Sequence, residues 1–391
     1  MTEYARPETE LLLLCASPPG SEERTERIRQ LAGQKLDWDY LLMAATAHAL
    51  LPLLYWGVKG VRPEAVPTSL EQSFQQNTQN NVHLTRELFQ MMSWFASEGI
   101  RVLPFKGPTL AAAAFGNLAL RRYSDLDLLV RQEDAVRARR VLEANGYKAV
   151  PPVSELNPKW EGAYLRAYDE FGMRGPDGQP LVELHWGVTP RYFCVPLDIA
   201  PYWERATTVN LGGHEIPSLG GEDLLMVLCL HATKHCWSHL SMVSDVAWLM
   251  TACQIHWNVV LDRARALGAL RMVLLSAELS GHLLKVALPK EVVRGVAADP
   301  DVQILAADVK MRLLQSPDAE VPRSLLQKIL GASWFHLRVR ERWLDRMRYV
   351  VRLATTVGVE DWEFVNLPAS LAFLYPVFRF PRLLWKYRSH P

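Results

Sequence analysis

The sequence is poor in cysteine, has almost no excess of charge of either sign and contains no long apolar run. Its five cysteines are odd in number and form no Cys-x-x-Cys pair, which argues against a disulfide framework or a cysteine-based zinc site. The 43 basic and 42 acidic residues nearly cancel, and the net charge of +1 provides no broad basic field for a polynucleotide. We therefore expect reduced, mostly packed thiols and no long nucleic acid as partner.

No segment has the character of a secretory signal or a membrane span. The first ten residues, MTEYARPETE, are acidic rather than basic, and the apolar run at 11–14 is too short for a signal core. No uninterrupted apolar stretch approaches the roughly 18 residues that a transmembrane helix needs. The simplest expectation is a cytoplasmic protein.

The sequence does contain enough apolar material for a globular protein of about two or three domains. Hydrophobic residues make up 49% and charged residues 22% of the 391 positions, which excludes a largely disordered chain. Apolar residues recur at helical spacing before residue 98 and again beyond about residue 195. The prediction is an N-terminal helical region (1–98), a core (99–190) and a C-terminal helical region (191–391).

The central segment predicts an α/β (α+β) core with a small mixed sheet. Short apolar runs typical of strands occur at 102–105, 126–130 and 147–150. Two predicted helices separate them, one beginning at Pro108 and the other ending before Gly146, which are common start and stop signals. The strand–helix–strand–helix–strand order is typical of an α/β fold.

A hairpin is predicted to follow this core. Its arms cover 164–173 and 180–186, and the Gly-Pro-Asp-Gly sequence at 175–178 between them favours chain reversal. The second arm therefore brings a further strand to the sheet.

The most informative segment is RRYSDLDLLV at 121–130. Residues two apart in a strand point to the same face, so Asp125 and Asp127 are predicted to project together. Two adjacent carboxylates repel one another unless a cation lies between them, and Mg²⁺ prefers such oxygen ligands. For so short a pattern, two solvated acids at a strand edge are the alternative.

A second feature, LPFKGPT at 103–109, places a strand end, a glycine and a helix start in succession. Gly107 permits close approach of the backbone to a ligand, and unpaired N–H groups at a helix start attract an anion. Lys106, Arg121 and Arg122 add positive charge for phosphate oxygens. An ordinary strand-to-helix turn is the alternative.

A third acid lies in VELHW at 182–186. Glu183 and His185 share one face of the predicted strand. Beside the first acidic strand, Glu183 would serve as a third metal ligand or as the base for an attacking hydroxyl. An exposed hairpin glutamate is the alternative.

These blocks together resemble a known family. The segment LPFKGPTLAAAAFGNLALRRYSDLDLLV, then VELHW, then HATKHCWSHLSMVSDVAWLM and LPASLAFLYPVFRFPRLLWKY is similar to the uncharacterised nucleotidyltransferases of the polymerase-β-like superfamily. The resemblance extends from about residue 80 onward. It departs at Pro108, where the superfamily often has Ser or Gly, and at the third acid, which is often Asp.

The resemblance implies transfer of a nucleoside monophosphate from an NTP, with ATP the first choice, in the presence of Mg²⁺ or Mn²⁺. Asp125, Asp127 and Glu183 would hold the metal ions and form the catalytic triad. Lys106, Gly107 and Arg121 would bind the triphosphate. The acceptor, a small molecule, a peptide or a protein, is not specified, and neither is the oligomeric state. An NTP-dependent phosphotransferase and a catalytically silent nucleotide-binding or scaffold protein are the alternatives.

Three histidines downstream, His231, His235 and His239, recur every four residues and are predicted to lie along one helical face. Two histidines one turn apart have zinc-ligand spacing, but the third would lie about 12 Å along the axis from the first. The resemblance implies instead that Lys234 reaches phosphate and that His235 contacts nucleotide or acceptor, with Asp245 anchoring one of these cations. A polar helix face packed on the core is the alternative.

The segment at 375–388 mixes aromatic and basic residues and contains two prolines. A membrane-surface or nucleic-acid site uses such a composition, but the prolines break any long amphipathic helix. The favoured interpretation is a terminal segment that docks on its own protein.

Overall fold

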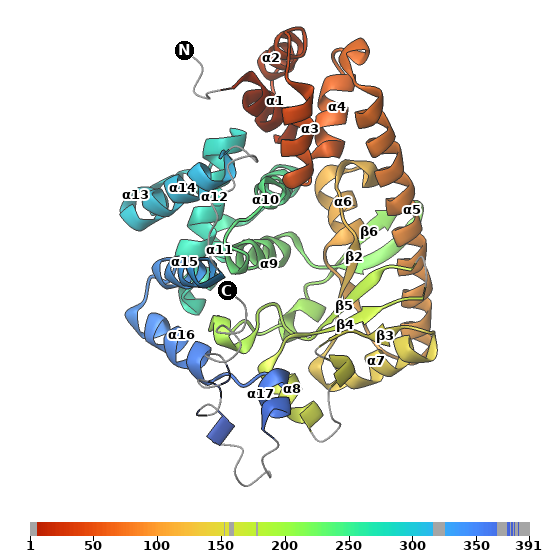
Figure 1. Ribbon diagram of the computed structural model, residues 1–391, viewed down its shortest axis with the longest axis vertical. Helices are drawn as coiled ribbons and strands as arrows, with labels where there is room; N and C mark the ends of the chain where they lie inside the picture. The colour runs from red at the N-terminus through yellow and green to blue at the C-terminus, as the bar shows by residue number, and fades with distance from the viewer. Residues whose placement is uncertain are drawn as a thin grey trace.

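The computed structural model (Figure 1) arranges a small mixed sheet between two groups of helices. It describes residues 6–151, 153–155, 160–176, 179–315 and 325–365, with positions 374, 375, 377, 379 and 382. Within these ranges no helix is both long and apolar enough to cross a membrane.

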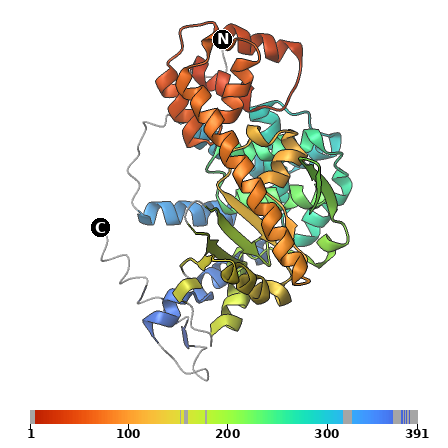
Figure 2. The same ribbon diagram turned by 90° about the vertical axis from the view of Figure 1, so that its right-hand side faces the viewer.

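The N-terminal helices end in one long helix that covers the sheet. They are α1 (Pro7–Ala16), α2 (Glu22–Ala32), α3 (Trp38–Ala47), α4 (Leu51–Lys59) and α5 (Thr68–Ser97). The second half of α5 buries Leu84, Leu88, Met91 and Phe95, which follow the helical spacing of the sequence. Figure 2 shows α5 lying across one face of the sheet.

The core follows the predicted element order and forms a five-stranded mixed sheet, in the order β1-β2-β5-β4-β3. Its elements are β1 (Leu103–Pro104), α6 (Gly107–Phe115), β2 (Asp125–Leu129), α7 (Ala135–Ala144), β3 (Lys148–Ala149), α8 (Glu161–Ala167), β4 (Glu170–Arg174) and β5 (Leu181–His185). The central strand β2 runs parallel to β5 and antiparallel to β1. The α/β expectation is confirmed.

The two faces of the sheet differ in chemistry. Leu126, Leu128, Val182 and Leu184 are at most 1% exposed and pack with the apolar side of α5 and with α7. The alternating positions of β2 and β5, Asp127 among them, point to the other face, toward the C-terminal helices. One face therefore builds the core and the other is free to build a site.

The prediction for the first arm of the hairpin, at 164–173, is wrong in part. The strand β4 begins only at Glu170, and residues 161–167 form α8 instead. Tyr164 stacks on Tyr168 with ring centroids 4.2 Å apart and on Phe171 at 5.4 Å, contacts that a turn of helix before the strand makes possible. The second arm matches β5, and residues 177–178 of the turn lie outside the described residues.

The C-terminal region also departs from the purely helical expectation, because it begins with a two-stranded antiparallel sheet. Its elements are β6 (Thr207–Leu211), β7 (His214–Ser218), α9 (Gly221–Lys234), α10 (Leu240–Ala252), α11 (Trp257–Leu267), α12 (Leu270–Leu284), α13 (Lys290–Ala298), α14 (Pro300–Leu313), α15 (Leu325–Arg338), α16 (Trp343–Thr355) and α17 (Val359–Phe364). Gly212 and Gly213 turn the hairpin with positive φ, the usual glycine turn signal.

The described positions of the aromatic and basic C-terminal segment lie against the protein. Tyr375 is 1% exposed, and its ring meets that of Trp160 edge-on at 5.6 Å. Arg379 and Arg382 pair with Asp361 at 3.0 and 2.5 Å. These contacts agree with a segment docked on its own chain.

Candidate active site

The acidic residues meet because β2 and β5 pair in parallel register. Asp127 lies directly opposite Glu183, and Asp125 lies two residues before Asp127, on the same face of β2. Asp127 is 3% exposed, whereas Asp125 and Glu183 are half-buried. The structure thus brings the three predicted acids to one wall of a single cavity.

Lys106 neutralises the most buried of these acids. Its Nζ lies 2.5 Å from Oδ1 of Asp127, and the lysine is 9% exposed. Lys106 is the N-cap residue of α6, and the following Gly107 has a φ of +53°, which glycine adopts without strain. The Lys-Gly pair therefore turns the chain into α6 and places the ammonium over β2.

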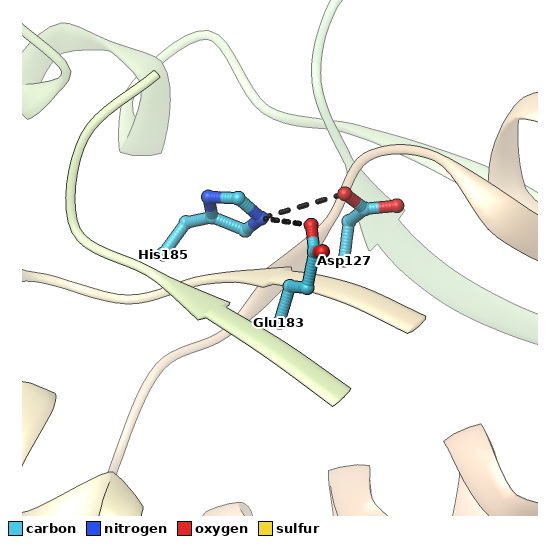
Figure 3. Close-up of side chains that lie close together, drawn as sticks. All are labelled: Asp127, Glu183 and His185. Atoms are coloured by element: carbon cyan, nitrogen blue, oxygen red, sulfur yellow. Dashed lines mark ion pairs between the residues drawn. The ribbon is translucent and has the colours of Figure 1, made fainter. Parts of the chain in front are cut away.

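His185 belongs to the cluster but was not among the predicted site residues. Its Nε2 lies 3.4 Å from both Oδ1 of Asp127 and Oε2 of Glu183 (Figure 3). Burial disfavours the imidazolium, yet the surrounding carboxylates raise the pKa of His185 to about 9. The signal was available, because His185 shares a strand face with Glu183.

The two aspartates of β2 are tuned in opposite directions. Burial and the charges of Asp127 and Glu183 raise the pKa of Asp125 to about 6. Burial acts in the same sense on Asp127, but Lys106 and His185 outweigh it and lower the pKa of Asp127 well below its usual range. Asp125 thus forms no ion pair with a cation among the described residues, and a bound cation would relieve its repulsion by Asp127 and Glu183.

The cavity between the sheet and α9 measures about 480 Å³. It contains every predicted site residue except Gly107. Its lining consists of Phe105, Lys106, Arg121, Arg122, Tyr123, Ser124, Asp125, Asp127, Glu170, Glu183, His185, Val188, Val227, His231, Lys234, His235, Ser238, His239 and Met242. The lining therefore combines the carboxylates of the sheet with basic side chains, among them Lys106 and Arg121 near β2 and Lys234 and His235 at the end of α9.

This geometry agrees with the comparison of the chain with protein families. Residues 34–285 match a family described as uncharacterised nucleotidyltransferase. The chain belongs to this family. The matched residues span α3–α12 and include the whole cavity. No curated protein matches the chain.

In this family member Arg121 is already held by a carboxylate. Its Nε and Nη2 lie 2.8 and 2.9 Å from the two oxygens of Asp245 on α10. The sequence had placed Asp245 beside a cation of the 231–239 segment, and the structure pairs it with Arg121 instead. Arg121 still lines the cavity, whereas Arg122 is exposed and carries no ion pair within the described part of the chain.

Three asparagines of α5 secure the loop that carries Arg121, and the sequence analysis missed them. Asn81, which is 0% exposed, donates to the carbonyls of Leu118 and Arg121 at 2.6 and 2.8 Å. Asn77 donates to the Arg121 carbonyl at 3.4 Å, and Asn80 donates to that of Tyr123 at 3.1 Å. The sequence carried a signal for them, because Asn77, Asn80 and Asn81 are three and four residues apart and so share one face of the helix.

The sequence had predicted that the three histidines share one helical face, and this prediction is wrong. The helix α9 ends at Lys234, and Cys236 and Trp237 have positive φ. His239 belongs to the start of α10 and contacts the Ala47 carbonyl through Nδ1 at 2.9 Å. His231 and His235 remain neighbours, with ring centroids 4.6 Å apart, and burial lowers the pKa of His235 to about 4.

The acids fit a hard divalent cation. Asp127 and Glu183 each offer a carboxylate oxygen, and these two atoms lie within 4.8 Å of each other. Asp125 lines the same cavity next to them. Carboxylate oxygens are the ligands that Mg²⁺ uses in proteins, so these three acids suit the metal that the sequence resemblance implies.

Proposed function

We propose that the protein is a Mg²⁺-dependent nucleotidyltransferase that transfers a nucleoside monophosphate from an NTP, ATP in the first instance, to an acceptor. The observation that carries this proposal is that Asp125, Asp127 and Glu183 line one cavity of about 480 Å³ together with cationic side chains. Transfer at phosphorus needs alignment and charge neutralisation more than covalent help from protein, and this arrangement offers both.

Asp125, Asp127 and Glu183 would hold the metal. When bound, Mg²⁺ or Mn²⁺ would neutralise phosphate charge and make the acceptor oxygen a better nucleophile. Lys106 fixes Asp127 through its 2.5 Å contact and keeps that carboxylate ionised. Asp125, which pairs with no cation among the described residues, is the acid left free to take up a ligand.

Lys234 and His235, on the opposite wall, would contact the triphosphate. Arg121 would attract the triphosphate by its positive charge rather than by a direct hydrogen bond, because two of its donor groups already bind Asp245. In the reaction, an acceptor oxygen forms a bond to the α-phosphorus, the bond from that phosphorus to the β-phosphate oxygen breaks, and pyrophosphate leaves with the electron pair. As an alternative to its role as a metal ligand, Glu183 can accept the proton of the acceptor hydroxyl.

The near-neutral charge of the chain favours a small molecule, a peptide or a protein as acceptor over a long nucleic acid. The cytoplasm is the compartment proposed for the reaction, consistent with the ATP and Mg²⁺ that it requires.

Calorimetric titration of ATP, GTP, CTP and UTP with MgCl₂ or MnCl₂ tests the proposal. Asp125→Asn should weaken metal-dependent binding and slow turnover at least about 100-fold, since it removes a charge that the transition state needs. Asp262→Asn is the matched control, because Asp262 is 75% exposed and, among the described residues, forms an ion pair with its helix neighbour Arg265 alone.

Product analysis separates the alternatives. Release of pyrophosphate indicates nucleotidyl transfer, whereas formation of ADP from ATP indicates a phosphotransferase. Failure of the folded wild type to bind any NTP in the presence of metal would contradict the proposal and favour a scaffold protein.

A further inference from the structure

A second pair of acids lies on the other side of His185. Glu170, the first residue of β4, is the direct cross-strand partner of His185 in the antiparallel β4–β5 pair. The Nδ1 atom of His185 lies 3.3 Å from Oε2 of Glu170, while its Nε2 atom faces Asp127 and Glu183. The imidazole therefore stands between two groups of carboxylates, one at each ring nitrogen.

Asp169, next to Glu170, is a buried carboxylate that the charges of Lys234 and His185 compensate only in part. It is 6% exposed, and its Oδ2 atom is buried with no hydrogen-bond partner among the described residues. Lys234 acts on it electrostatically, but no ion pair joins Asp169 to a lysine or arginine in the part of the chain that the structure describes. An ionised carboxylate in this state costs free energy unless a cation approaches it, and burial raises the pKa of Asp169 accordingly.

We propose that Asp169, Glu170 and His185 form a binding site for a divalent transition ion of the zinc class. One donor atom from each residue lies within 4.8 Å of the others, close enough to converge on one ion. One imidazole nitrogen with two carboxylate oxygens is a donor set suited to Zn²⁺, whereas Mg²⁺ favours oxygen alone.

The surroundings of His185 support this assignment. A histidine that binds a metal through one nitrogen usually turns the other toward a carboxylate, which fixes the ring. The Nε2 atom of His185 meets this condition at Asp127 and Glu183, 3.4 Å from each. Among the described residues neither ring nitrogen has a well-aligned hydrogen-bond partner, and the residue is 4% exposed. An ion that binds at Nδ1 would displace the proton that the surrounding carboxylates keep there. The ion would hold β4 to β5 and set the orientation of His185 at the edge of the catalytic cavity.

This site does not depend on the proposed nucleotidyl transfer. The experiment is a Zn²⁺ titration of the metal-stripped full-length protein, without nucleotide, against a chromophoric chelator, with Co²⁺ as the spectroscopic probe. With MgCl₂ in excess to occupy the catalytic carboxylates, wild type should bind one equivalent of Zn²⁺, and Co²⁺ in its place should give the visible absorption of an ion with a nitrogen ligand. Asp169→Asn and Glu170→Gln should each weaken binding about 100-fold or more, because each removes a ligand. Asp125→Asn and the exposed Asp262→Asn should leave Zn²⁺ binding unchanged.

Thermal unfolding provides a second measurement that a purely structural role would not satisfy. Without metal, Asp169→Asn should melt at or above the wild-type temperature, because it removes a buried charge. With Zn²⁺, only the wild type and the two control variants should gain stability. If Asp169→Asn does not fold, Glu170→Gln decides the question.

No Zn²⁺ binding by wild type, or equal affinity in wild type and the two ligand variants, would overturn the proposal. Loss of Zn²⁺ binding in Asp125→Asn alone would also overturn it, since the ion would then lie in the catalytic cavity. Mg²⁺-dependent NTP binding is measured separately, so failure of either proposal leaves the other standing.

Discussion

The guanidinium of Arg121 and the carboxylate of Asp245 form a pair with two contacts, Nε to Oδ1 at 2.8 Å and Nη2 to Oδ2 at 2.9 Å, across 124 positions of sequence. Their side chains are 14% and 12% exposed. The pair joins the loop before β2 to α10 and so ties the sheet to the C-terminal helices. It also positions a cationic side chain at the cavity without leaving it free to move.

Replacing Asp245 by Asn should therefore destabilise the fold. The variant leaves a buried guanidinium without its counter-charge, which costs about 3 kcal/mol of unfolding free energy. Urea denaturation measures this change. The matched control is Asp262→Asn, whose exposed pair with Arg265 contributes less than about 0.5 kcal/mol. Equal losses in the two variants would show that the Arg121–Asp245 pair has no special role.

Asn81 should prove important for the loop although it touches no acid of the site. Its amide nitrogen donates to the carbonyls of Leu118 and Arg121 at 2.6 and 2.8 Å from a fully buried position. Asn81→Ala removes both donors and should cost about 2 kcal/mol. Hydrogen exchange of the amides at 117–124 should become faster.

Asn145→Ala is the control for this prediction. Asn145 is exposed and, in the described part of the chain, its side chain donates to the Val141 carbonyl of its own helix at 2.9 Å, so its loss should change neither stability nor exchange at 117–124. Unchanged exchange in Asn81→Ala would mean that Asn77 and Asn80 hold the loop without it.

His336 should make the stability of the protein depend on pH. Its Nδ1 lies 3.0 Å from the Tyr349 hydroxyl and its Nε2 lies 3.1 Å from the Lys234 carbonyl, contacts that suit a neutral ring. Burial, then the charge of Arg340, lowers the pKa of His336 from 6.5 to about 4. Below pH 6.5 the unfolded chain binds this proton and the folded chain does not, so stability should fall as the pH falls toward 4.

The expected loss from this one group is about 3 kcal/mol between pH 6.5 and 4. Urea denaturation at a series of pH values measures it, and His336→Gln, which keeps a donor and an acceptor, should flatten the profile. The exposed His214 provides the control, because it forms no ion pair among the described residues and His214→Gln should leave the profile as it is in wild type. A wild-type slope that survives in His336→Gln would assign the effect to other groups, His235 among them.

The acids of the cavity could be named from the sequence because their signals are local. Alternation along a strand puts Asp125 and Asp127 on one face whatever lies around them, and the same rule pairs Glu183 with His185. The Lys-Gly step before α6 is equally local, because glycine at positive φ is a property of the chain itself. Their roles in nucleotide and metal binding stay predictions.

Two predictions made from the sequence were wrong, the one for His239 and the one for the first arm of the hairpin. The recurrence of histidine every four residues suggested one helix that continues through His239. The helix ends before that, because Cys236 and Trp237 have positive φ. The loop that they form brings His239 to Ala47. Strand β4 begins late because Tyr164, Tyr168 and Phe171 stack across the end of α8. The position of His239 depends on a partner from another segment, Ala47. The stack of Tyr164, Tyr168 and Phe171 lies within one stretch of the chain, and its helical spacing was a local signal that the strand prediction missed.

The sequence by itself therefore determined the family, the order of the core elements and the face of each acidic strand, because these depend on neighbours within a few residues. The tertiary structure alone decided that Asp127 meets Lys106 and Glu183, that Arg121 is held by Asp245, and that His185 lies between two acid pairs. Strand register and helix docking bring these side chains together, and both are set by how the whole apolar core packs rather than by any local pattern.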